Sequence, residues 1–276
     1  MRKCIKNSRI ILLGLTLCFL NANAEELIYE ITENPFILDV DHVKKPIRFS
    51  HSVSDGDVNV DAADGHHIEI RISDLRSKND LEDGRAFLKV DSRTGSVKLD
   101  CRGEFRESDF ECFVPDDTVL SLRASDGDIR IENISGDVNC SASDGDILLK
   151  NVSGRISAES SDGDISLFQE KKSSLPISIS TNDGSIAVHL ASDVDAKIAA
   201  NVIDGKVNFN LSGTIKSTAD HPHHSKESKK LKMPWLKQRT IKIGEQKNPQ
   251  AIQLNTLDGD ILISNRPKTT TQKSEK

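Results

Sequence analysis

The sequence has few aromatic residues, which excludes a core built from large rings. Nine Phe, one Tyr and one Trp make up 4% of the 276 residues. No Leu/Glu/Lys heptad recurs, so a coiled coil is excluded as well. Beyond the first 24 residues, no segment is apolar enough to span a membrane. Any core must therefore be narrow and filled by small and branched side chains.

The first 24 residues have the pattern of a secretory signal peptide. Four basic residues precede or adjoin a short apolar stretch over 10–20, and Ala22-Asn23-Ala24 supplies a small-x-small cleavage site. We therefore expect cleavage after Ala24 and an exported bacterial protein without a membrane span. Both the periplasm and the exterior of the cell remain open as its location.

The charge of the chain is unevenly distributed. Residues 214–276 hold 13 basic and 6 acidic residues, a net charge of +7, whereas residues 25–213 carry a net charge of −17. An acidic body repels phosphates, so nucleic acid is excluded as its partner. The basic segment, with a His/Lys-rich insertion predicted over 217–238, can contact an anionic surface or form a solvated loop.

Three cysteines remain after cleavage, in a compartment that permits disulfides. Cys101 and Cys112 flank a polar segment typical of a connection between two strands, which predicts a Cys101–Cys112 disulfide. Cys140 is then left over, and we expect it to fill the core as a small apolar residue.

An internal repeat is the main signal in the sequence. Glycines recur every nine residues, and Ser-Asp-Gly-Asp-Ile recurs every 18 residues from Ser125 to Ile165. Apolar residues alternate after each turn, as in a strand with one buried face. Glycine would supply the positive φ of the bend. The regularly spaced glycines are Gly127, Gly136, Gly145, Gly154 and Gly163.

These units predict an all-β fold, a parallel β-solenoid (β-helix) with about 18 residues per coil. Ile129, Ile147 and Ile165 should stack inside it. We expect the solenoid domain to span residues 25–265 and residues 25–50 to supply less regular strands that cap its N-terminal end. A polar tail over 266–276 should be disordered.

Residues 110–147 carry a family resemblance. Val114-Pro115 ends a strand, and alternating Ser-Gly-Asp-Ile and Gly-x-Val units follow, as in Ser125 to Ile129 and Ser135 to Val138. The chain resembles the bacterial putative-adhesin family of unknown function, of the DUF4097 type. The resemblance implies a β-solenoid and an exported location, and it implies no catalytic chemistry.

Two sets of residues are candidate metal ligands. Stacked aspartates about 4.8 Å apart repel one another by roughly 1 kcal/mol, which bound Ca²⁺ would relieve. The alternative is that these aspartates cap turns and stay hydrated, without any cofactor. Three histidines of the insertion could bind a transition metal or remain solvated. The calcium candidates are Asp126, Asp128, Asp144, Asp146, Asp162 and Asp164, and the histidines are His221, His223 and His224.

The sequence favours a binding protein over an enzyme. The aspartates recur with the turns, so the repeat explains them without catalysis, and no catalytic motif is present. We expect a non-catalytic, adhesin-like or scaffold surface in the cell envelope, with an envelope protein or a polysaccharide surface as partner. The alternatives are a polysaccharide-active parallel β-helix enzyme and a calcium-binding β-roll.

Overall fold

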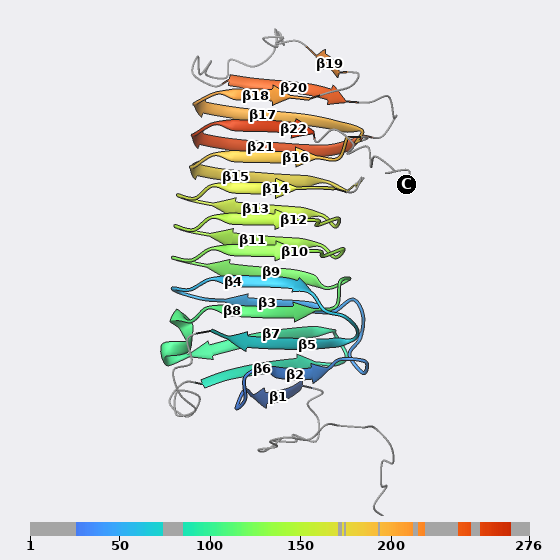
Figure 1. Ribbon diagram of the computed structural model, residues 1–276, viewed down its shortest axis with the longest axis vertical. Coiled ribbons are helices and arrows are strands. Elements are labelled where there is room, and N and C mark those ends of the chain that lie inside the picture. The colour runs from blue at the N-terminus through green and yellow to red at the C-terminus, as the bar shows by residue number, and fades with distance from the viewer. Residues whose placement is uncertain are drawn as a thin grey trace, which may run out of the picture.

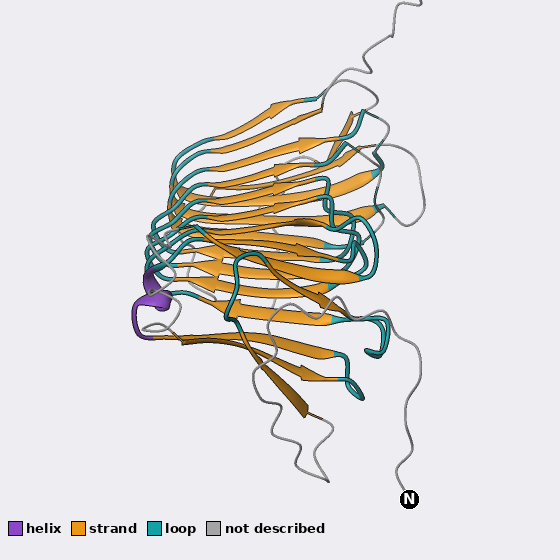
Figure 2. Cartoon of the chain, turned by 60° about the horizontal axis from the view of Figure 1, so that its bottom comes forward, coloured by secondary structure: helices purple, strands orange, loops and turns teal. Residues whose placement is uncertain are grey.

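The chain folds into two long β-sheets that face each other across one core. A computed structural model describes residues 26–73, 85–170, 173, 175–192, 194–211, 215–218, 237–243 and 249–265. From β7 (Ser96–Arg102) to β19 (Ile215–Thr218), successive strands alternate between the two sheets, so this part of the chain winds as a flattened coil (Figure 1). Figure 2 shows the turns gathered along the two long margins, with the short 3₁₀ helix η1 (Gly103–Glu107) at one of them. The expected parallel β-solenoid is confirmed.

One sheet has 12 strands and the other has 10, in an order that differs from the order along the chain. The 12-stranded sheet runs β1 (Glu26–Glu30), β6 (Arg85–Asp91), β7 (Ser96–Arg102), β3 (Arg48–Ser52), β9 (Val119–Ala124), β11 (Val138–Ala142), β13 (Ile156–Ser160), β15 (Ile177–Asp183), β21 (Gln250–Asp258), β17 (Ala196–Asp204), β20 (Lys237–Ile243) and β19 (Ile215–Thr218). The 10-stranded sheet runs β18 (Val207–Asn210), β22 (Ile261–Asn265), β16 (Ile186–Leu190), β14 (Ile165–Phe168), β12 (Ile147–Lys150), β10 (Ile129–Glu132), β4 (Val58–Ala62), β8 (Phe110–Val114), β5 (His67–Ile72) and β2 (Phe36–Asp39).

The central coils, from β9 to β16, stack in sequence order as the repeat predicts. Ile129 pairs with Ile147, which pairs with Ile165, all in parallel register. These three side chains are buried with at most 1% of their surface exposed. The 18-residue spacing therefore places equivalent aliphatic residues one above another, and their stacking fills the space between the sheets.

Both ends of the chain fold back into the stack, which the sequence analysis did not foresee. The coil β3–β4 lies between β7–β8 and β9–β10, and the coil β21–β22 lies between β15–β16 and β17–β18. Figure 1 shows the latter as red strands between yellow and orange ones. The expectation that residues 25–50 cap the N-terminal end is therefore wrong for β3. It holds for β1 and β2, which form the outermost strands there.

Antiparallel strands close the two ends of the solenoid. At the N-terminal end, β6 pairs antiparallel with both β1 and β7, and β5 pairs antiparallel with both β2 and β8. At the other end, β20 pairs antiparallel with β17 and β19. The predicted insertion over 217–238 is too wide, because residues 217–218 belong to β19 and residues 237–238 to β20.

The leader, the middle of the insertion and the tail over 266–276 lie outside the described residues. In the described part of the chain, no helix is long and apolar enough to cross a membrane.

The core is narrow and mainly aliphatic, as the low aromatic content predicts. Cys140 pairs with Ala158 in the wall of the core and is 1% exposed, so its expected role as a small buried residue is confirmed. The largest fully buried side chains include Phe49 and Phe110 in the N-terminal part. The rings of His51 and Phe110 pack in a T-shaped arrangement, with ring centroids 4.5 Å apart.

The glycines of the central repeat are needed for close approach between coils. A Cβ atom on Gly145 would lie 2.0 Å from the carbonyl oxygen of Gly127, and one on Gly154 would lie equally close to that of Gly136. Neither Gly145 nor Gly154 has a positive φ. The expectation that these glycines supply a left-handed bend is therefore wrong, and contact between successive backbones explains them instead.

Candidate functional site

The second aspartate of each Asp-Gly-Asp turn forms a hydrogen-bonded ladder from coil to coil. The main-chain N–H of Asp146 donates to Oδ1 of Asp128 at 2.8 Å, and the N–H of Asp164 donates to Oδ1 of Asp146 at the same distance. Each carboxylate therefore accepts a hydrogen bond from a main-chain N–H group of the turn that has no partner in the strand pairing. In strand order, this position holds Asp109, Asp57, Asp128, Asp146, Asp164, Ser185, Asp260 and Lys206.

The first aspartate of each turn forms a second column, whose order the inserted coil changes. Asp258 of β21 pairs in register with both Asp183 and Asp204, so it stands between them. Coils stacked in chain order would instead have Asp183 and Asp204 as direct neighbours. In strand order, this column holds the exposed residues Asp55, Asp126, Asp144, Asp162, Asp183, Asp258 and Asp204.

Neither aspartate column forms a compact group of metal ligands. Among the described residues, no three or more His, Cys, Asp or Glu side chains are placed to hold one metal ion. The candidate histidines His221, His223 and His224 lie outside the described residues. The ladder accounts for the second aspartate by hydrogen bonding, which favours the turn-capping interpretation.

We expect Ca²⁺ to leave the stability of the protein nearly unchanged. The melting temperature in millimolar Ca²⁺ should match that in EDTA. Asp146→Asn keeps an acceptor oxygen and should be neutral, whereas Asp146→Ala removes the acceptor and should cost about 1 kcal/mol. Thermal melts of the three proteins with and without Ca²⁺ test this. A rise of many degrees with Ca²⁺ that Asp146→Asn abolishes would show a calcium site instead.

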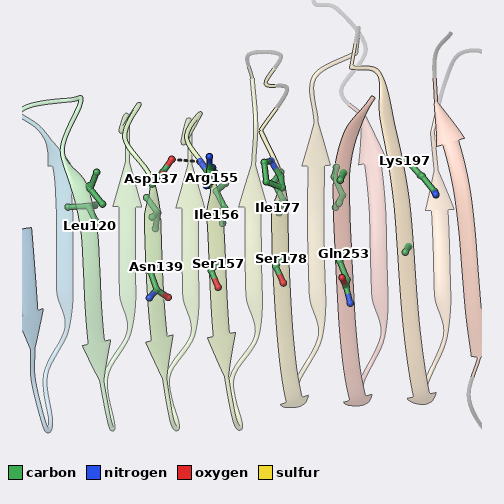
Figure 3. A pocket seen from close by; sticks show the side chains of 16 residues that line it. Leu120, Asp137, Asn139, Arg155, Ile156, Ser157, Ile177, Ser178, Lys197 and Gln253 are labelled. Carbon is green, nitrogen blue, oxygen red and sulfur yellow. Dashed lines mark hydrogen bonds between the residues drawn. The ribbon is translucent and has the colours of Figure 1, made fainter. Parts of the chain in front are cut away.

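The outer face of the 12-stranded sheet carries the main groove. It has a volume of about 640 Å³ and crosses six strands in the direction of the solenoid axis. Its floor is a row of polar side chains on neighbouring strands, which Figure 3 shows side by side (Asn139, Ser157, Ser178 and Gln253). Apolar residues, among them Val119, Pro176 and Ala251, line the groove beside this row.

Charged side chains border the groove. Asp137 and Arg155 lie on adjacent turns, and the main-chain N–H of Arg155 donates to Oδ1 of Asp137 at 2.9 Å (Figure 3). Lys197 of β17 contributes a second exposed cation. Of the residues that line the groove, Asp137 is the only acidic one. The groove thus offers hydroxyl and amide groups on its floor and a mainly cationic border.

Comparison with known proteins shows the family. The model of the Toastrack DUF4097 family matches residues 117–264, which is more than half of the chain. The chain belongs to this family. The expected relationship to the DUF4097-type proteins is confirmed. No curated protein matches the sequence.

Two solved structures are similar to the Toastrack chain. A putative cell adhesion protein from Clostridium sporogenes has a TM-score of 0.48 and 14% identity, with 87% of this chain and 99% of that chain covered. A putative adhesin from Bacteroides fragilis has a TM-score of 0.32 and 10% identity, with 87% of this chain and 97% of that chain covered.

The Toastrack match covers the groove entirely and begins just before β9. The coils from β9 to β22 lie within it almost completely, whereas β1 to β8 precede it. The N-terminal part, including the inserted coil β3–β4, therefore lies outside the matched region. The surfaces that β3 and β7 form belong to this N-terminal part.

The three cysteines in the described part of this Toastrack protein, Cys101, Cys112 and Cys140, are free thiols. Cys101 on β7 and Cys112 on β8 both face the core, from opposite sheets. Burial raises the pKa of Cys140 to about 12 and that of Cys101 to about 12, and it raises the pKa of Cys112 still further. All three are therefore protonated at neutral pH and poor nucleophiles. The Cys101–Cys112 disulfide stays a prediction.

A Ser–His contact on the 10-stranded sheet was not predicted from the sequence. Ser264 Oγ lies 2.5 Å from Nδ1 of His189, and the His189 ring stacks on Phe168 with centroids 4.6 Å apart. Ser264 and His189 are 75 positions apart and become neighbours only because β22 inserts beside β16. No local motif marks such a pair.

Proposed function

We propose that this protein is an exported, non-catalytic, adhesin-like protein that binds a partner on the outer face of its 12-stranded sheet. The observation that carries this proposal is the groove of about 640 Å³ across six strands, with its polar floor. The leader sequence supports export to the cell envelope or beyond it. The partner would be a polysaccharide surface or an envelope protein.

The shape and chemistry of the groove support binding of an extended ligand. Floor residues recur at the strand spacing of about 4.8 Å, so a chain lying along the axis meets a donor or acceptor at regular intervals. Hydroxyl and amide side chains form hydrogen bonds with sugar hydroxyls or with a peptide backbone. Glycoside hydrolysis ordinarily uses two carboxyl groups, whereas the lining of this groove holds only Asp137.

Blocking the groove tests this proposal. Ser157→Trp places a large ring on the groove floor, and Ser166→Trp places one at a similarly half-buried position on β14 in the other sheet. We expect Ser157→Trp to weaken binding to a captured glycan or envelope protein by about tenfold or more, and Ser166→Trp to leave it unchanged. Glycan-array and pull-down assays with residues 25–276 measure this.

Equal binding by both tryptophan variants would contradict a role for the groove. Release of oligosaccharides from a bound polysaccharide, lost on Asp137→Asn, would instead support the polysaccharide-active enzyme.

A further inference from the structure

A second hollow lies on the same outer face, towards the N-terminal end. It has a volume of about 620 Å³ and lies over β7, β3 and β9, next to η1. We call it the basic trough, and it is lined by Ser50, His51, Ser52, Lys98, Leu99, Asp100, Cys101, Arg102, Gly103, Arg106, Ser121 and Arg123. It adjoins the groove, because β9 contributes residues to both.

Four exposed cations surround the basic trough, although the body of the chain is strongly acidic. Lys98 and Arg102 come from β7, Arg106 from η1 and Arg123 from β9. The consecutive elements β7 and η1 and the later strand β9 thus bring like charges together. Such a cluster is unfavourable without a counter-charge, and it creates a local positive potential that attracts anions.

The single acidic residue of the basic trough is already neutralised. Lys89 donates to Oδ2 of Asp100 at 2.5 Å, and this hydrogen bond holds the pKa of Asp100 below its ordinary value. Arg102 approaches the same oxygen at 3.9 Å, and its guanidinium also lies over the ring of Phe87. Asp100 is therefore paired with a lysine outside the lining, and the lining keeps an excess of positive charge.

The residues beneath the surface add no negative charge. Burial lowers the pKa of His51 to about 4, so this side chain is neutral at pH 7. Its Nδ1 lies 3.2 Å from the carbonyl oxygen of Leu99, and its ring packs on Phe110 in the core. Burial keeps Cys101 protonated. The charge of the basic trough thus comes entirely from its exposed side chains.

Serine residues form the floor between the cations. Ser50 pairs in register with Lys98 on one side and with Ser121 on the other, and Ser52 pairs with Arg123. The strands β7 and β9 flank β3, so they are two strand spacings, or about 10 Å, apart. This width admits one acid group of a sugar ring between cationic side chains, with serine hydroxyls in reach of its oxygens.

We propose that the basic trough binds the acid group of an acidic polysaccharide, one that carries carboxylate, sulfate or phosphate groups. This inference rests on the proposed function and names its ligand class. The cations supply the charge complement, and the arginines among them suit bidentate pairing with an oxyanion. The lining of the basic trough favours a sugar polymer over a protein, because no exposed aliphatic or aromatic side chain in it offers a protein anchor.

The proposal is tested by removing two cations whose side chains have no hydrogen-bond or ion-pair partner among the described residues. Arg106→Ser/Arg123→Ser should weaken binding of residues 25–276 to heparin, a sulfated glycan, by about tenfold or more. The control Lys44→Ser/Lys206→Ser removes two exposed charges elsewhere and should retain full affinity.

The salt dependence of heparin binding is a second test. Binding of the parent protein should fall steeply as the salt concentration rises from 0.15 to about 1 M, because the screening length of charges in solution falls from about 8 to 3 Å. Polygalacturonate, a carboxylated glycan, is the second probe and neutral dextran the negative one.

A third variant separates the basic trough from the insertion. Replacing Lys226, Lys229, Lys230 and Lys232 by Gln removes charge from the insertion only, and heparin affinity should persist. Loss of affinity in this variant, with none in Arg106→Ser/Arg123→Ser, would overturn the proposal in favour of the insertion. Equal affinity for single-stranded DNA and heparin would overturn the assignment to glycans.

The same set of proteins separates this proposal from the proposed function. If Ser157→Trp weakens binding of a neutral glycan or protein while heparin is not bound, the basic trough proposal fails and the groove proposal stands. If neither Ser157→Trp nor the double arginine variant changes any binding, both fail.

Discussion

Gly145→Ala is expected to destabilise the protein by about 3 kcal/mol, which lowers its melting temperature by roughly 10 °C for a chain of this size. The added Cβ would meet the carbonyl oxygen of Gly127 at 2.0 Å and its carbonyl carbon at 2.5 Å. Both atoms belong to the backbone of the next coil, so neither can rotate away. The two coils must separate locally, which weakens the strand pairing of β10 with β12. Thermal melts followed by far-UV circular dichroism measure the effect.

Gly103→Ala is the matched control. Gly103 has a φ of +63°, and a Cβ there would meet nothing within 4 Å. Its substitution should cost only the left-handed backbone conformation, about 1 kcal/mol. If Gly145→Ala lowers the free energy of unfolding by no more than Gly103→Ala does, close approach between coils is not the reason why glycine occupies these turns.

A chain that ends after residue 248 is expected to lose the folded structure of β17 to β20. It lacks β21 and β22, each of which pairs with two strands, so β15 and β16 lose their neighbours as well. Leu254 and Ile263 are fully buried, and each contributes about 2 kcal/mol of apolar burial. Hydrogen exchange measured by mass spectrometry should show amide protection lost in β17, β18 and β20 and kept over 119–160.

A chain that ends after residue 265 is the control for this truncation. It lacks only residues 266–276 and should match the full chain in amide protection and melting temperature. Protection of β17 in the shorter chain at the level of the control would show that β17 pairs with β15 directly when β21 is absent.

The central solenoid could be predicted from the sequence because its signal is local and periodic. An 18-residue recurrence places Ile129, Ile147 and Ile165 in one column whatever the rest of the chain does. The burial of Cys140 follows from the same register. The insertion of β3–β4 and β21–β22 could not be predicted, because Asp57 and Asp260 have the same turn motif as the central coils. A repeat defines which residues stack, and it does not define the order of coils with equivalent surfaces.

The candidate sites show a similar division. The outward polar positions, such as Asn139 and Ser157, follow from the strand alternation, and so does the presence of aspartate columns. The groove and the basic trough depend on which strands become neighbours. Arg102 and Arg123 are 21 positions apart on β7 and β9, and they flank one hollow only because β3 lies between these strands. A count of charges along the sequence does not reveal this cluster, because its residues belong to a segment whose net charge is negative.

The intercalated ends restrict how such a protein can change length during evolution. Tandem duplication of an 18-residue unit adds a coil without disturbing its neighbours only between β9 and β16, where order along the chain and order in space agree. Each such event would lengthen both sheets by one strand, or about 4.8 Å, and would extend the groove by the same distance. Variation in the length of the solenoid and of its groove can therefore arise in the middle of the molecule, while the two intercalated ends stay constant.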